Sequence, residues 1–369
     1  MPHVLITGGA GFIGSHVADA LIARGDRVRV LDVLDPQVHP TQSRPAYLHP
    51  DIELIVGDVR NSESVARALR GVDAVFHFAA TVGVGQSMYA VEKYTSVNVL
   101  GTAVLMEALA RQPVARLVVA SSMSIYGEGL YITEDGRVAH ARPRAIGDMR
   151  GGQWEPRSET GEPLTPLPTP ESKMPTLESV YAVGKYDQER LCLMLGKAYA
   201  IPTVALRFFN VYGPRQALSN PYTGVLAIFA ARLLNNRPPL VFEDGRQMRD
   251  FVHVRDVAQA CLLALETKQG LGDVFNVGSG ESRSVLSIAS DLASVLGHRI
   301  SPHITGKYRA GDIRHCFADI SKIESTLGFA PSIKFRDGLE ELAGWLAGQI
   351  AEDRVEHATA ELEARGLVA

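Results

Sequence analysis

Residues 7–16 read TGGAGFIGSH, and they join two segments with different sequence patterns. The preceding run at 3–7, HVLIT, is apolar and β-like, whereas residues 15–25 have the spacing of a helix. Gly8, Gly9, Gly11 and Gly14 satisfy the pattern G-x-G-x-x-G at this junction. Such glycines allow a tight turn and bring a helix N-terminus close to a pyrophosphate. The stretch predicts a dinucleotide-binding β–α turn, and a glycine-rich turn without a ligand is the alternative.

The first half of the chain repeats this strand and helix alternation. Short β-branched runs occur at residues 27–32, 52–58, 74–80 and 116–122, with helical patterns between them. Strands that alternate with helices pair in parallel, and uninterrupted apolar runs fit strands covered on both faces. We therefore expect an α/β fold with a doubly wound parallel sheet of the Rossmann type.

Composition excludes several classes of protein. The 369 residues carry a formal net charge of -4, which argues against a basic nucleic-acid surface. Cys192, Cys261 and Cys316 lie far apart, so we expect buried thiols, with no disulfide framework and no metal site. Neither a leader-like segment nor a membrane-length apolar run is visible. We expect a cytoplasmic protein that binds no membrane.

Asp32 ends the second predicted strand, about 20 residues beyond the glycines, where a carboxylate accepts hydrogen bonds from a ribose diol and repels a 2′-phosphate. This position favours NAD over NADP. Asp58 ends the third predicted strand, where it would reach the adenine or, alternatively, cap the following helix. Residues 78–80, Phe-Ala-Ala, end the fourth and leave room for the cofactor. Asn98 has the alternative of bonding within its own helix.

Tyr181 and Lys185 stand one helical turn apart in the stretch YAVGK. A cation beside a phenol favours phenolate, which would make the tyrosine a base. The same two-letter pattern also arises by chance, and alone it assigns no function.

Taken together, the motifs resemble the extended short-chain dehydrogenase/reductase family, and within it the NAD-dependent nucleotide-sugar epimerases and dehydratases. GGAGFIGSH, HFAA, VASSMSIYG, YAVGK, RFFNVYGPRQ, RDFVHVRDV, FNVGSG and YRAGDIRHCFADISK follow one another in the family's order over nearly the whole chain. The resemblance implies Ser122, Tyr181 and Lys185 as catalytic residues, with Ser122 four residues before Tyr126. Ser122 has the alternative of a hydroxyl that only bonds backbone at a strand end.

The same resemblance implies two sets of binding residues. The expected NAD contacts are Gly8, Gly11, Phe12, Ile13, Gly14, Asp32, Asp58, Val59, Phe78, Ala79, Ala80, Asn98, Tyr181 and Lys185. The expected contacts of a dTDP- or UDP-linked hexose are Val84, Gly85, Gln86, Ser87, Ser122, Asn210, Arg249, Arg309 and Asp312. Two arginines can neutralise a diphosphate without a net basic charge, whereas a solvated surface pair is the alternative.

Ser122 is followed by Met123 and Ser124, not by the Asp-Glu pair that serves as acid and base in the family's 4,6-dehydratases. The resemblance therefore implies a 4-epimerase. Stretches such as VGVGQSMY, GGQWEP and RQALSNPYTGV resemble the family's dTDP-L-rhamnose 4-epimerases, with UDP-glucose 4-epimerase as the alternative. A nucleotide-sugar-binding protein without catalysis on the same fold is the alternative from another class.

The expected organisation has two interleaved parts. Residues 1–210 would form the NAD-binding Rossmann domain, to which 251–278 return, and 211–350 mainly a smaller nucleotide-sugar-binding domain, followed by a C-terminal helix at 351–369. The Pro- and Gly-rich excursion at 128–179 lies near the sugar site, and we expect it to form a lid that includes Trp154, with a surface loop or dimer contact as the alternative. The resemblance also implies a homodimer that pairs through helices near 96–111 and 179–198.

Overall fold

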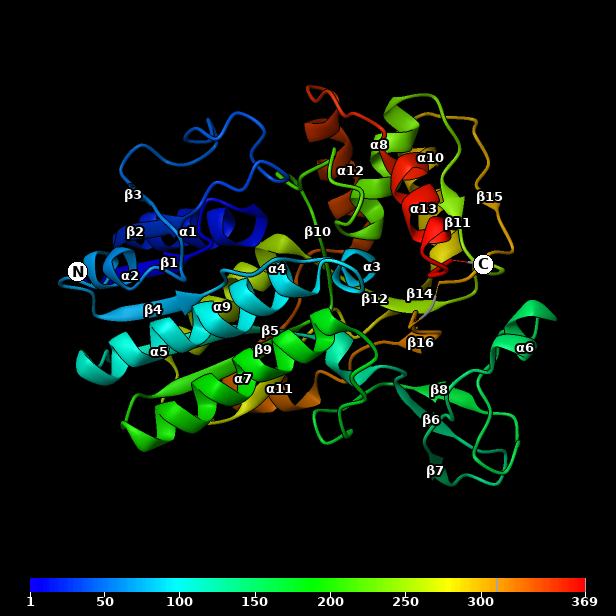
Figure 1. The fold of residues 1–369 in the computed structure, drawn as a ribbon, viewed down its shortest axis with the longest axis horizontal. Helices are drawn as coiled ribbons and strands as arrows, with labels where there is room; N and C mark the ends of the chain where they lie inside the picture. Colours follow the sequence, from blue (N-terminus) through cyan, green and yellow to red (C-terminus); the bar gives the residue numbers. More distant parts are fainter. Residues whose placement is uncertain (310, 369) are drawn as a thin grey trace.

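The computed structural model describes residues 1–309 and 311–368 (Figure 1). Its largest element is a seven-stranded sheet in the order β13-β9-β5-β4-β1-β2-β3, in which every pairing is parallel. The strands are β1 (His3–Thr7), β2 (Arg27–Asp32), β3 (Glu53–Val56), β4 (Ala74–His77), β5 (Arg116–Ser122), β9 (Thr203–Phe208) and β13 (Val274–Val277). The predicted doubly wound parallel sheet is confirmed.

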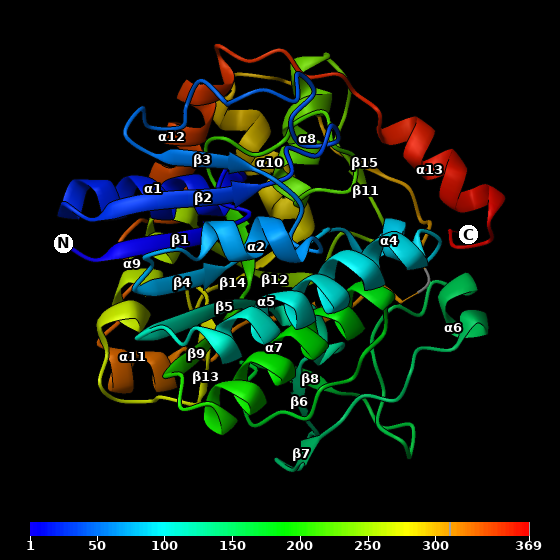
Figure 2. The same ribbon diagram turned by 60° about the vertical axis from the view of Figure 1, so that its left-hand side comes forward.

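Helices cover both faces of this sheet (Figure 2). One face packs against α1 (Phe12–Arg24), α9 (Val254–Glu266) and α11 (Ser321–Leu327). The opposite face packs against α2 (Ser62–Ala68), α5 (Gly101–Arg111) and α7 (Val180–Ala198). Because successive side chains of a strand point to opposite faces, Val4 and Ile6 enter the first core and Leu5 the second.

A second layered part follows β9 and has its own core. Its strands are β10 (Asn210–Tyr212), β12 (Met248–His253), β14 (Ser282–Ser284) and β16 (His315–Cys316), with β11 (Leu240–Val241) and β15 (His303–Ile304) as a separate pair. Its helices are α8 (Val225–Leu234), α10 (Val285–Val295), α12 (Phe335–Leu346) and α13 (Val355–Ala364). Although β13 follows β12 in sequence, it belongs to the seven-stranded sheet, so the chain returns to the first part. The boundary proposed at residue 210 stays a prediction.

Short helices complete the first part around the end of β4 and β5. They are α3 (Val84–Ser87), α4 (Val91–Thr95), the π-helical turn η1 (Ser96–Leu100) and the 3-10 helix η2 (Met123–Tyr126). Cys192, Cys261 and Cys316 are buried free thiols, as expected. Within residues 1–309 and 311–368, no helix has the length and apolar character needed to cross a bilayer.

The excursion at 128–179 is a small structured unit, which Figure 1 shows at the lower right, apart from the seven-stranded sheet. It contains β6 (Leu130–Ile132), β7 (Val138–Ala139) and β8 (Thr165–Leu167), paired antiparallel in the order β7-β6-β8, and α6 (Ile146–Arg150).

Candidate active site

A cavity of about 900 Å³ lies at the carboxyl edge of the seven-stranded sheet and extends to the second part. The residues that end β1, β2, β4, β5 and β9 line one side, and residues of α8, β12 and α13 line the other. Ligands of open parallel sheets bind outside the carboxyl ends of the strands. The cavity is therefore the candidate site.

The glycine-rich turn between β1 and α1 has a shape that suits a pyrophosphate. Gly8 has φ +71, and a Cβ there would lie 2.8 Å from the backbone nitrogen of Ala79. A Cβ on Gly14 would lie 2.6 Å from the carbonyl oxygen of Gly8. Gly11 is the N-cap of α1 and no side chain caps it, so the first-turn amides of the helix are free to bind an anion at the cavity. The residues present thus fit a dinucleotide.

Asp32 lies at the end of β2 on the cavity wall. Its carboxylate accepts hydrogen bonds from the backbone N–H groups of Ala10, at 3.0 Å, and Leu34, at 2.9 Å. Burial raises the pKa of this carboxyl, while the two backbone hydrogen bonds oppose the rise. The side chain is thus held in place where a ribose diol would reach it.

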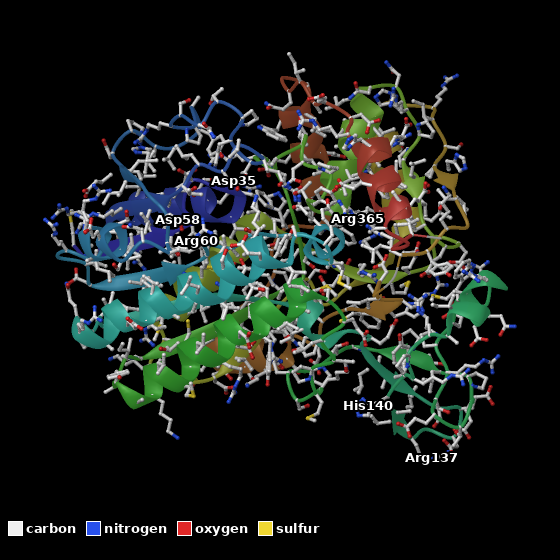
Figure 3. All side chains as sticks on the ribbon, in the orientation of Figure 1. Asp35, Asp58, Arg60, Arg137, His140 and Arg365 are labelled. Carbon is white, nitrogen blue, oxygen red and sulfur yellow. The ribbon has the colours of Figure 1, made fainter. Side chains whose placement is uncertain are left out.

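Most of the other predicted NAD contacts also line the cavity. Phe12, Ile13, Asp58, Val59, Phe78, Ala79 and Ala80 all do so. Asp58 pairs with Arg60 at 2.6 Å, which lowers the pKa of the carboxyl, and Figure 3 shows both beside the sheet. The alternative role for Asp58 is wrong, because Asn61 caps α2 by accepting from the backbone N–H of Ser64.

Asn98 is not brought to the cavity. Its side chain is fully buried, and both ends of the amide bind the backbone of Thr81: Oδ1 accepts from N–H at 2.8 Å and Nδ2 donates to the carbonyl at 3.1 Å. The residue therefore joins η1 to the segment after β4, and the expected NAD contact has no support in this arrangement. The alternative, in which the Asn98 side chain caps or bonds within its own helix, is wrong, because both ends of the amide bind Thr81.

The three predicted catalytic residues all line the cavity. Ser122 comes from β5, whereas Tyr181 and Lys185 come from α7. Ser122 ends β5, and its hydroxyl lies 2.7 Å from that of Ser124. Tyr181 lies in the first turn of α7, which Ser179 caps by accepting from the backbone N–H of Ala182. Burial raises the pKa of Tyr181, and a hydrogen bond with Ser122 opposes the rise.

The ammonium of Lys185 has an acceptor on its own helix. Its ammonium donates to Gln188 Oε1 at 2.7 Å, and burial lowers the pKa of the lysine to about 8. The expectation that Lys185 and the positive nicotinamide ring of bound NAD together favour the phenolate of Tyr181 stays a prediction, and the protein groups by themselves raise the pKa of the phenol. The physical reason is that the phenol is desolvated while the ammonium is directed to an acceptor on its own helix.

Gln188 belongs to a fully buried polar network that sequence analysis missed. Thr102 donates to the carbonyl of Asn98 and so accepts from Gln188 Nε2, at 3.0 Å, and from His77 Nε2, at 2.8 Å. His77 Nδ1 then accepts from the hydroxyl of Thr7. Burial lowers the pKa of His77 to about 3, so the imidazole is neutral, as these bonds require. The network fixes the Gln188 amide with its oxygen toward Lys185.

The predicted substrate contacts divide into two groups. Val84, Gly85, Asn210, Arg249, Arg309 and Asp312 line the cavity. Arg249 donates to the carbonyls of Ile313 and Arg314, and Asp312 lies 3.2 Å from Arg309 and 3.7 Å from Arg249. The alternative of a solvated surface pair does not describe Arg249, whose side chain is 12% exposed, whereas the side chain of Arg309 is 39% exposed.

Gln86 and Ser87 do not line the cavity. Gln86 pairs with Gln37, and the hydroxyl of Ser87 donates to the carbonyl of Val84. Because both lie in the four-residue helix α3, only the side of that helix with Val84 and Gly85 faces the cavity.

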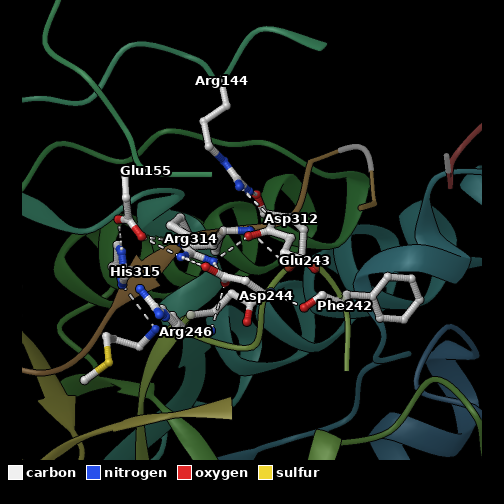
Figure 4. A network of polar contacts seen from close by, with 12 residues as sticks. Arg144, Glu155, Phe242, Glu243, Asp244, Arg246, Asp312, Arg314 and His315 are labelled. Carbon is white, nitrogen blue, oxygen red and sulfur yellow. Dashed lines mark hydrogen bonds and ion pairs between the residues drawn. The ribbon is translucent and has the colours of Figure 1, made fainter. Parts of the chain in front are cut away.

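The excursion is not a wall of the cavity, which corrects the expected lid. Across the described residues, every cavity-lining position falls outside 128–179, and Trp154 packs against Tyr308. Ion pairs and hydrogen bonds join the excursion to residues that border the cavity or lie behind it (Figure 4). Arg144 donates to the carbonyl of Asp312 at 2.8 Å and to Glu243 at 2.6 Å. Glu155 contacts Arg314 and, at 2.8 Å, His315.

Comparison with known proteins assigns the class. The family model "NAD dependent epimerase/dehydratase family" matches residues 4–145 and 158–278. The chain therefore belongs to this family of NAD-dependent enzymes, which confirms the resemblance read from the ordered motifs and the expectation of NAD as cofactor.

Relatives within the family differ in their sugars. The dTDP-L-rhamnose 4-epimerase of Burkholderia thailandensis is 34% identical over 94% of this chain and 95% of its own length. A putative UDP-glucose 4-epimerase of Methanocaldococcus jannaschii is 32% identical over 93% of this chain and 98% of its own. The structure of Thermus thermophilus UDP-glucose 4-epimerase with NAD has a TM-score of 0.74 and 32% identity, covering 94% of this chain and 99% of that one.

Proposed function

We propose that this protein is a nucleotide-sugar 4-epimerase that interconverts dTDP-L-rhamnose and dTDP-6-deoxy-L-talose through a 4-keto sugar. The observation that carries the proposal is the meeting of Ser122, Tyr181 and Lys185 beside the glycine-rich turn, on the wall of one cavity. Met123 and Ser124 line the same wall where a dehydratase needs two carboxylates. The choice of sugar nucleotide is supported by the similarity to the Burkholderia enzyme.

In this proposal Tyr181 takes the proton of the C4 hydroxyl and later returns it. Ser122 binds the same sugar oxygen and orients it toward the phenol. NAD supplies the hydride acceptor for oxidation at C4 and the hydride for reduction from the other face. Arg249 and Arg309 neutralise the diphosphate, so that the nucleotide stays anchored while the 4-keto hexose turns.

The base role sets an electrostatic requirement. A free tyrosine has a pKa of about 10, so a base that works near pH 7 needs a shift of about three units, or about 4 kcal/mol. Burial of Tyr181 acts in the wrong direction. Positive charge close to the phenol has to supply this shift and also offset the effect of burial. Lys185, one turn along α7, would provide that charge in its ammonium form together with the positive nicotinamide ring of bound NAD.

The test is turnover of dTDP-L-rhamnose, UDP-glucose and UDP-galactose, with products separated by sugar configuration. We expect dTDP-L-rhamnose to be converted with the highest kcat/KM. Faster interconversion of UDP-glucose and UDP-galactose would replace the proposal by the second candidate, UDP-glucose 4-epimerase, which the Methanocaldococcus and Thermus relatives favour. Binding without turnover of any of the three would favour a nucleotide-sugar-binding protein.

We also propose that the protein is a homodimer that pairs through η1, α5 and α7. Large apolar side chains are exposed on η1 and α7: Leu100, at 52%, Val183, at 41%, and Met194, at 56%. An exposed apolar face on a folded domain marks an interaction surface.

Replacing Gln188 with leucine is expected to move the alkaline limb of the pH–rate profile downward by about one pH unit. The amide oxygen stabilises the charged form of Lys185, so its loss lowers the lysine pKa below about 8. The lysine then becomes neutral at lower pH and stops favouring phenolate. Profiles of kcat between pH 6 and 10 measure the shift.

Gln112→Leu is the matched control, because Gln112 follows α5 on the surface and its side-chain amide donates to the carbonyl of Leu69. Its profile should coincide with that of the parent. An unshifted limb in Gln188→Leu would show that the buried amide does not tune Lys185.

A further inference from the structure

The C-terminal helix α13 forms a wall of the cavity, a role that its polar sequence did not suggest. Val355, Ala358, Thr359 and Leu362 line the cavity, followed by Leu367 beyond the helix. Four of these five side chains are apolar. Their spacing of three and four residues places Val355, Ala358, Thr359 and Leu362 on one face of the helix, while the opposite face is exposed.

Polar contacts hold α13 on the cavity. Glu361 accepts from the hydroxyls of Tyr89, at 3.2 Å, and Tyr222, at 3.4 Å, and these two hydroxyls are 2.7 Å apart. Arg365 bonds Glu361 at 3.0 Å and lies over the ring of Tyr89 at 4.4 Å. We call Tyr89, Tyr222, Glu361 and Arg365 the tyrosine–glutamate cluster, and Figure 3 shows Arg365 at this end of the molecule.

Two glycines make room for this arrangement next to α3. A Cβ on Gly85 would lie 3.3 Å from Leu362 Cδ1, so Leu362 packs directly over Gly85. Gly83 has φ +121, and a Cβ there would lie 2.8 Å from Tyr222 Cβ. Leu362 is thereby placed at the segment 83–85, and the family resemblance implies that Val84 and Gly85 in this segment line the hexose end of the substrate.

We propose that α13 is the wall that faces C6 of the hexose, and that Leu362 is a specificity-determining residue for a 6-deoxy sugar. This inference rests on the proposed function, because it takes the segment 83–85 as the hexose end. A methyl group gains from contact with an apolar wall, whereas a C6 hydroxyl loses a water partner and meets no acceptor on Leu362 or Ala358. The wall therefore selects by desolvation.

The test compares dTDP-L-rhamnose with dTDP-L-mannose, which differs from it only by the C6 hydroxyl. We expect Leu362→Asn to reduce the ratio of kcat/KM for the deoxy sugar over the hydroxylated one by about tenfold or more, within the range that one hydroxyl contact commands. Ala358→Ser, on the same face, should shift the ratio in the same direction. Leu362→Met and the outward-facing Ala360→Gln should leave it within about threefold of the parent.

Binding separates this inference from the proposed function. In a Tyr181→Phe background, calorimetry with the same two sugar nucleotides gives the ratio of Kd without turnover. A shifted Kd ratio in Leu362→Asn supports the role of α13 even where the parent fails to convert dTDP-L-rhamnose, a failure that would contradict only the proposed function. Unchanged ratios in both inner-face variants, in protein that retains NAD, would overturn the inference, as would a parent that binds neither sugar nucleotide.

Discussion

Tyr181→Phe is expected to lower kcat by about 10²- to 10⁴-fold, the contribution of a positioned proton-transfer group. The substitution removes the hydroxyl that takes the C4 proton and keeps the ring, which lies edge-on to Tyr94 with centroids 6.5 Å apart. NAD content and the unfolding transition should stay those of the parent, because the packing of α7 is retained. Steady-state kinetics with the preferred sugar nucleotide measures the change.

Tyr186→Phe is the control for this prediction. Tyr186 lies five residues further along α7 and packs on the core of the sheet instead of lining the cavity. Its kcat should remain within about threefold of the parent. If Tyr181→Phe keeps kcat within tenfold, a barrier change of only about 1.4 kcal/mol, then Tyr181 is not the base.

Arg314→Met is expected to lower the free energy of unfolding by about 3 kcal/mol. The guanidinium is fully buried and donates to Glu243 at 2.9 Å and to Asp244 at 2.6 Å, and it also contacts Glu155 (Figure 4). Glu243 is buried as well, and burial raises the pKa of its carboxyl. Methionine fills the space but leaves this carboxylate with Arg144 as its one cationic partner among residues 1–309 and 311–368.

The comparison variant is Arg336→Met on α12, whose side chain is 80% exposed and pairs with Glu340 on the surface. An exposed pair contributes about 0–1 kcal/mol, so this change should barely move the midpoint of urea unfolding. Equal midpoints for the two variants would mean that the buried guanidinium does not hold the excursion and the second part together.

Local sequence patterns were sufficient to predict the fold and most of the residues on the cofactor side of the cavity. The glycine turn, the strand ends and the Tyr181–Lys185 pair are specified by neighbours in sequence, so their positions could be predicted. Asn98 and Gln86 could not be placed, because which face of a short helix meets a cavity depends on how that helix packs. The hydrogen bonds of Asn98 to Thr81 and of Gln86 to Gln37 turn these side chains away from the cavity.

The places of the excursion and of α13 could not be predicted, for the same reason. Arg144 and Glu155 sit in a polar, irregular stretch, and nothing nearby in sequence indicates that their partners are Asp312 and Arg314. The apolar spacing of Val355, Ala358 and Leu362 was the available signal for a helix with a buried face. What that face covers is determined by long-range packing against Gly85.

The position of β13 at the border of the seven-stranded sheet has a consequence for synthesis of the chain. Until residue 277 has left the ribosome, β9 has a partner only in β5, and its other side is an open strand edge. Open edges of buried parallel strands pair readily with other chains. The ribosome must therefore synthesise β10, α8, β11 and β12 of the second part before the first part is closed, and a fragment that stops at residue 210 would leave a sheet prone to aggregate.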